Sequence, residues 1–104
     1  MNVYTARIEG EDEAHHWYAW GEDEAQARAR LIEGMTRGFE NAIANENWTA
    51  LSLAKVLGVL TRDRAIEIED EDVSILPAEI EHFRQALDAA ITPMALAGHD
   101  WVWL

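Results

Sequence analysis

The sequence contains no cysteine, only two prolines and no apolar run long enough to cross a membrane. Without cysteine, the chain cannot form disulfides, cysteine-based zinc sites, iron–sulfur clusters or thiol nucleophiles. A membrane helix needs about 18 consecutive apolar residues, and the start of the chain lacks the basic-then-apolar pattern of a signal peptide. We therefore expect a soluble, cytoplasmic protein.

Basic residues are also scarce. The 104 residues include 20 acidic and 8 basic side chains, which gives a formal net charge of −12. Phosphate groups and anionic membrane surfaces repel such a chain, so we expect it to bind neither nucleic acid nor a membrane directly. The expected partner is a basic protein surface. The alternative is that the acidity serves only to keep the protein soluble.

The first half of the chain predicts strand, turn, strand and helix. The length suits one domain over residues 1–104. Alternating side chains predict strands over residues 2–9 and 14–20, joined as a hairpin. Helical spacing begins after Gly21, and Gly34 and Gly38 are the expected stop signals for this helix.

The second half of the chain contains apolar segments with helical spacing and others with the two-residue alternation of a strand. Asn47 is the expected cap of a buried helix over residues 48–60, although a strand is an alternative that periodicity alone does not separate. Alternating isoleucines and glutamates predict a strand over Ala65–Glu69, with an acidic turn at residues 70–72 leading to a further short strand.

Pro77 suits the first residue of a last helix, and residues 99–104 predict a terminal strand. The expected fold is therefore α+β. We expect a small, mostly antiparallel sheet made of the N-terminal hairpin, the Ala65–Glu69 strand and the C-terminal strand, packed by two or three helices.

The acidic residues fall into two blocks. Residues 1–24 hold seven acids and one base, residues 65–88 hold eight acids and one base, and the stretch between them is slightly positive. Such asymmetry favours an electrostatic interaction face. On a strand, alternate carboxylates would lie about 6–7 Å apart in a regular row. The candidate partner-binding residues are Glu9, Glu11, Asp12 and Glu13 in the first block, and Glu67, Glu69, Asp70, Glu71 and Asp72 in the second.

Metal and catalytic motifs are weak. Adjacent His15 and His16 would point to opposite faces of a strand, so they could not chelate one ion together. The acids after residue 70 follow part of a calcium-loop spacing, but Ile75 stands where that loop needs glycine. Neither of the two serines lies in a nucleophile elbow. We expect no metal, no cofactor and no enzymatic activity, with a small metal-binding protein or enzyme as an alternative.

Two sequence features concern possible contacts with other molecules. Five tryptophans are present, and Trp101 and Trp103 share one face of the predicted terminal strand, which makes them candidate interface or homodimer residues. The alternative is that they belong to the core.

Residues 53–59 resemble the first helix and turn of a helix-turn-helix, but acids follow where a recognition helix would face phosphates. We therefore expect an ordinary buried helix there.

In composition, the chain is similar to small acidic phage-encoded inhibitors, including anti-CRISPR and anti-restriction proteins that mimic DNA. This likeness is one of general character and carries no residue roles. It implies a non-enzymatic inhibitor that engages the basic, nucleic-acid-binding surface of a partner protein. The alternative is a small structural or accessory homodimer whose acidity serves solubility.

Overall fold

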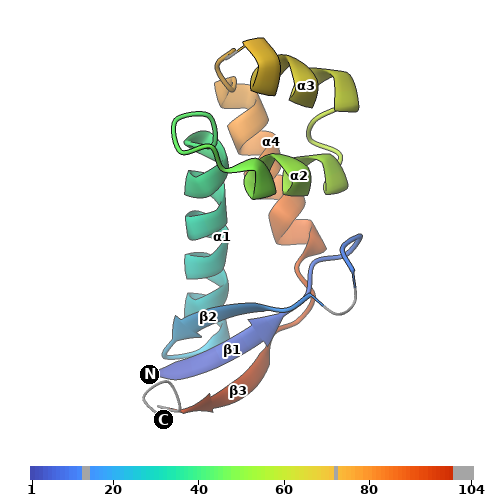
Figure 1. The fold of residues 1–104 in the computed structure, drawn as a ribbon. Coiled ribbons are helices and arrows are strands. Elements are labelled where there is room, and N and C mark those ends of the chain that lie inside the picture. The colour runs from blue at the N-terminus through green and yellow to red at the C-terminus, as the bar shows by residue number, and fades with distance from the viewer. Residues whose placement is uncertain (13–14, 72, 100–104) are drawn as a thin grey trace.

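The computed structural model describes residues 1–12, 15–71 and 73–99. Within them a three-stranded antiparallel sheet packs with four helices (Figure 1), which confirms the predicted α+β class. The strand order is β2-β1-β3. The elements are β1 (Asn2–Ala6), β2 (Trp17–Gly21), α1 (Glu24–Glu40), α2 (Trp48–Val56), α3 (Arg62–Glu71), α4 (Pro77–Ala90) and β3 (Ala95–His99).

The molecule is elongated. Its principal extents are 44 × 24 × 24 Å, and its radius of gyration is 14.5 Å, against about 13 Å for a compact domain of this length. The sheet lies at one end and α3 at the other, with α1 and α4 running between them (Figure 1). Features at the two ends can therefore act independently.

Helix α1 packs against the sheet at its start and against α4 at its end. The backbone N–H of Gln26 donates to Asp23 Oδ1 (2.8 Å), which caps the helix. The first turn approaches the sheet so closely that a Cβ on Gly21 would lie 2.5 Å from the backbone nitrogen of Ala27. At the far end Phe39 stacks on Phe83 of α4, with ring centroids 4.5 Å apart.

The predicted end of this first helix at Gly34 and Gly38 is wrong, because α1 continues to Glu40. Neither glycine adopts the positive φ that glycine provides at helix ends. Phe39, one residue beyond the second glycine, is fully buried. Its packing stabilises the last turns, because tertiary contacts commonly outweigh the roughly 1 kcal/mol penalty of a glycine inside a helix.

The helix predicted over residues 48–60 is confirmed by α2, although it ends at Val56, and the strand alternative is wrong. The backbone N–H of Ala50 donates to Asn47 Oδ1 (3.1 Å), as expected for the predicted cap. Pro77 also begins α4 as expected. Both predictions used local signals, a capping side chain and a proline, that act within one turn of the helix.

The predicted strand over Ala65–Glu69 is wrong, because these residues belong to α3. The backbone N–H of Arg64 donates to the Thr61 hydroxyl (3.1 Å), a capping signal that the alternating isoleucines obscured. Burial follows the helical spacing, since Ala65 and Ile68 are buried whereas Ile66 is 42% exposed. The predicted hairpin is wrong too, because Asp70 and Glu71 lie in α3 and the described residues 73–76 form no strand.

The third strand, β3, precedes the predicted C-terminal strand, and of the predicted range 99–104 only His99 lies in it. It pairs antiparallel with β1, and His99 lies opposite Asn2, the first residue of β1. Residues 100–104, and with them Trp101 and Trp103, lie outside the described residues. The prediction of an interface through these two tryptophans therefore stays a prediction.

One buried polar atom weakens the core. The Thr36 side chain on α1 is 1% exposed, and its hydroxyl finds no hydrogen-bond partner among the described residues. Replacing it by the methyl group of valine removes an unpaired polar atom and keeps the shape. We expect Thr36→Val to raise the free energy of unfolding by about 1 kcal/mol in urea titrations. The control is Thr49→Val at an exposed position in α2, and an equal effect of the two variants would contradict this account.

Candidate functional site

The first acidic block lies in the loop between β1 and β2, against the end of α2. At Gly10, which has a φ of 96°, a Cβ would lie 3.2 Å from Val56 Cγ1. Glu11 Oε1 accepts a hydrogen bond from Trp17 Nε1 (2.7 Å), so this carboxylate holds the loop to β2. Glu9 and Asp12 are exposed. Glu13 lies outside the described residues.

The second block lies on a helix instead of a strand, so its carboxylates are arranged differently from the prediction. Glu67 and Glu71 are four residues apart and are neighbours on α3, whereas Glu69 points to another side. The prediction that Glu67, Glu69 and Glu71 form a regular row is therefore wrong. Asp72 lies outside the described residues.

Helical spacing creates an acidic face that the sequence analysis missed. Asp63, Glu67 and Asp70 are all exposed. They follow one another at intervals of four and three residues, which correspond to about 6 Å and 4.5 Å along the helix axis. They lie on the side of α3 opposite the buried Ala65 and Ile68. We call Asp63, Glu67 and Asp70 the acidic face of α3. Asp63 could have been included had the helical period been recognised.

Arg64 orients this face. Its guanidinium donates to both carboxylate oxygens of Glu79 (2.8 and 3.0 Å), to Glu67 Oε1 (2.8 Å) and to the carbonyl of Ser74 (3.1 Å). These bonds join α3 to the first turn of α4. Because Arg64 and Glu79 are only 19% and 17% exposed, this pair is better shielded from solvent than a surface salt bridge. The cation thus bridges Glu79 of α4 and Glu67, one of the three residues of the acidic face, and it fixes the position of that carboxylate.

The two acidic blocks lie at different places on the molecule. Figure 1 shows the loop between β1 and β2 nearer the sheet and α3 at the far end, with α2 between them. A partner that contacts the acidic face of α3 therefore does not need the first block. The carboxylates of the second block lie on a helix, α3, which gives them a defined orientation, whereas those of the first block lie in a loop.

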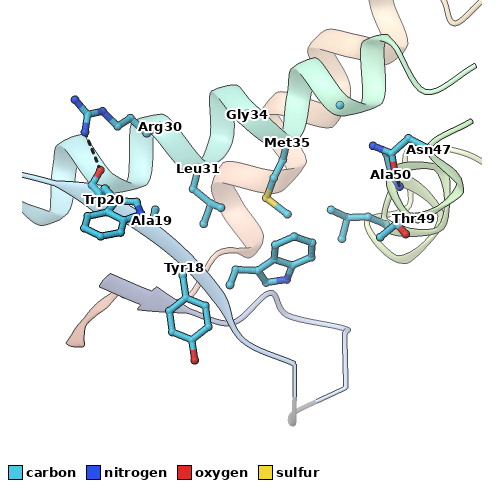
Figure 2. A pocket seen from close by; sticks show the side chains of 13 residues that line it. Tyr18, Ala19, Trp20, Arg30, Leu31, Gly34, Met35, Asn47, Thr49 and Ala50 are labelled. Carbon is cyan, nitrogen blue, oxygen red and sulfur yellow. Dashed lines mark hydrogen bonds between the residues drawn. The ribbon is translucent and has the colours of Figure 1, made fainter. Parts of the chain in front are cut away.

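A third feature is a groove of about 620 Å³ between β2, α1 and the start of α2 (Figure 2). Leu31 and Met35 extend from α1 towards β2, and Tyr18 points away from the helix (Figure 2). Most of the lining is apolar, and it includes Trp17, Leu31, Gly34, Met35, Ala50 and Leu53. Arg30 is the one charged residue among the described residues that line it, and it donates to the carbonyl oxygen of Trp20 (3.2 Å).

Gly34 accounts for part of this open space. A Cβ built on it would meet no atom within 4 Å, so a side chain there would extend into the groove. The sequence analysis assigned this glycine to a helix end and therefore missed the groove. Its role depends on a neighbouring strand, which lies more than ten residues away in the sequence and is placed only by the fold.

Metal ligands do not gather in the described part of the chain, where no group of three or more histidine, aspartate or glutamate side chains could hold an ion. Among the described residues no helix is long and apolar enough to cross a membrane. No family model, no curated protein and no solved structure matches the chain.

The hydrogen bonds from Arg64 lower the pKa of the Glu79 carboxyl below its usual value, and burial only partly opposes this. A carboxyl with a lowered pKa in the folded state stabilises the fold above its unfolded pKa, near 4.3, and this contribution is lost as the pH falls through the lowered value. We expect Glu79→Gln to reduce the free energy of unfolding by about 1–2 kcal/mol near neutral pH.

This deficit should shrink below about pH 4, where the unfolded chain's carboxyl is protonated. Chemical denaturation at a series of pH values measures the loss of unfolding free energy near neutral pH and its decrease at low pH. Glu69→Gln, at an exposed position on α3, is the matched control and should change little. A deficit that is independent of pH would show that the ion pair does not cause it.

Proposed function

We propose that the protein is a non-enzymatic inhibitor that binds a basic, nucleic-acid-binding surface of a partner protein through the acidic face of α3. The observation that carries the proposal is the placement of Asp63, Glu67 and Asp70 on one exposed side of a helix, where Arg64, bonded to Glu79 of α4, also holds the Glu67 carboxylate in place. Surfaces rich in lysine and arginine complement such a face, and they are the surfaces that bind nucleic acid.

The overall charge supports the same kind of partner. A net charge of −12 attracts a cationic surface at long range and speeds the encounter. Ile66, which is 42% exposed, lies one turn from both Asp63 and Asp70. It supplies an apolar contact along one edge of the face.

The position of α3 suits binding in a recess of the partner. The helix lies at one end of the elongated molecule (Figure 1), so it can enter a groove without steric interference from the sheet. Its carboxylates follow at about 4.5–6 Å along the axis, compared with one phosphate per about 3.4 Å on each DNA strand. The face thus has the negative sign of a phosphate row at a lower charge density. Inhibition follows because the protein and a nucleic acid cannot occupy the same basic groove together.

The test begins with affinity capture from the source organism's lysate on the immobilised protein, elution with a salt gradient and identification of what elutes. The captured protein is then purified, and its binding to labelled DNA or RNA is titrated with the chain. We expect release at moderate salt, because screening weakens contacts between exposed charges, and we expect displacement of the nucleic acid.

The variant that tests the face combines Asp63→Asn, Glu67→Gln and Asp70→Asn. We expect it to weaken partner binding about tenfold or more, with a reduced salt dependence. The matched control, Glu22→Gln, Glu40→Gln and Glu46→Gln, neutralises three exposed carboxylates outside α3. Equal effects of the two variants, or a partner that keeps its nucleic acid, would overturn the proposal.

A further inference from the structure

We propose that the groove between β2, α1 and the start of α2 binds a small amphipathic carboxylate, a molecule with one anionic head and an elongated apolar body. Arg30 holds the carboxylate at one end of the groove, and the apolar body lies along α1 over Gly34. None of the residues that line the groove belongs to the acidic face of α3. The proposal therefore goes beyond the proposed function and does not rest on it.

The groove has the size and the lining of a small-molecule site. Its volume of about 620 Å³ lies within the range of about 300–1,000 Å³ that is usual for ligand pockets. Ligand pockets are mostly apolar and carry a few well-placed polar groups. The large apolar side chains of this groove come from three elements and include Trp17, Leu31, Met35 and Leu53. A ligand that fits this surface therefore has a mainly apolar body.

Arg30 supplies a cation that has no acidic partner in the described part of the chain. The other two arginines of α1 each form an ion pair with a carboxylate. Arg30 instead donates from Nη1 to the carbonyl oxygen of Trp20 (3.2 Å) and to Sδ of Met1 (3.4 Å). Because both contacts involve Nη1 alone, the N–H groups of Nε and Nη2 have no partner among the described residues and are open to a ligand.

The chemistry of Arg30 favours a carboxylate as the head group. A guanidinium binds a carboxylate through two parallel N–H groups, which Nε and Nη2 provide on one edge. No acidic residue lines the groove among the described residues, so no lining carboxylate repels an anion there. A carboxylate carries one negative charge, whereas a phosphate monoester carries about 1.5–2 at neutral pH. A chain of net charge −12 therefore repels the carboxylate less.

Two glycines of α1 leave room for the apolar body. Arg30, Gly34 and Gly38 are each four residues apart and are neighbours along one side of the helix. A Cβ built on Gly34 would meet no atom within 4 Å, so this position is open. From Arg30 to Gly38 the helix axis rises by about 12 Å. The groove therefore accommodates an elongated body of this length better than a compact one.

Asn47 closes the far end of the groove. A Cβ on Gly38 would lie 3.3 Å from Nδ2 of Asn47, so this side chain lies directly over the glycine. The side chain is held there because its Oδ1 accepts the hydrogen bond from the backbone N–H of Ala50. Arg30 and Asn47 lie at opposite ends of the groove, with Met35 between them (Figure 2). The apolar body is therefore limited to the distance between these two ends.

Isothermal titration calorimetry of the full chain with saturated carboxylates from hexanoate to tetradecanoate, below their micelle-forming concentrations, tests the proposal. We expect the affinity to rise about fourfold with each added CH₂ and to level off once the body exceeds about 12 Å. Decanol has the chain of decanoate without its charge and should bind about tenfold or more weakly. Absence of decanoate binding, equal affinity for decanol, or an affinity that keeps rising beyond this length would overturn the proposal.

Three substitutions on α1 identify the site. Arg30→Gln removes the charge, and we expect decanoate to bind about tenfold more weakly, with little change for decanol. In Gly34→Leu the new side chain extends into the groove, and we expect both ligands to bind about tenfold more weakly. The matched control, Arg37→Gln, removes a charge at an exposed position of the same helix outside the groove and should change neither. Equal effects of the two arginine variants, or unchanged binding by Gly34→Leu, would exclude the groove.

The triple variant of α3 separates this proposal from the proposed function. It leaves every residue that lines the groove in place, so we expect it to bind decanoate as the unchanged chain does. Gly34→Leu should in turn keep its affinity for the captured partner protein. Far-ultraviolet circular dichroism of each variant checks that the helices are retained. Loss of decanoate binding in the triple variant would contradict the placement of the ligand in the groove.

Discussion

The contact between α1 and α4 is the constraint on which the rest of the molecule depends. Phe39 and Phe83 are completely buried and stacked, and they join the two longest helices near one end. Nearer the sheet, Arg28 of α1 bonds to Asp88 and to the carbonyl of Ile91. Because α4 leads directly into β3, this helix pair also sets where the third strand meets β1. The exposed ion pairs add little energy, so burial of the aromatic rings is the main term.

The two candidate surfaces depend on this helix pair in different ways. The groove exists because α1 is continuous past two glycines and lies along the edge strand β2. The acidic face depends on α3, which is joined to the first turn of α4 through Arg64 and Glu79.

Local signals explain the parts of the fold that were predicted correctly. Asn47 and Pro77 each act within a single helical turn, and the structure places them at the starts of α2 and α4. The N-terminal hairpin was also correct, since β1 and β2 pair antiparallel, although Val3 and Ala6, which alternation places on opposite faces of β1, are both buried. The Ala65–Glu69 segment failed for the opposite reason. Its isoleucines fit a period of two residues, and this alternation outweighed the Thr61 cap in the prediction, although burial of Ala65 and Ile68 follows the helical period.

The sequence by itself determined the sign of the charge, the absence of cysteine chemistry, the α+β class and most helix starts, since these depend on composition or on a few adjacent residues. Only the tertiary structure decided that Gly34 opens a groove, that Asp63 belongs with Glu67 and Asp70, and that the two acidic blocks lie apart. These properties depend on which distant segments lie side by side. That choice follows from the burial of apolar side chains over the whole chain, which no short stretch of sequence contains.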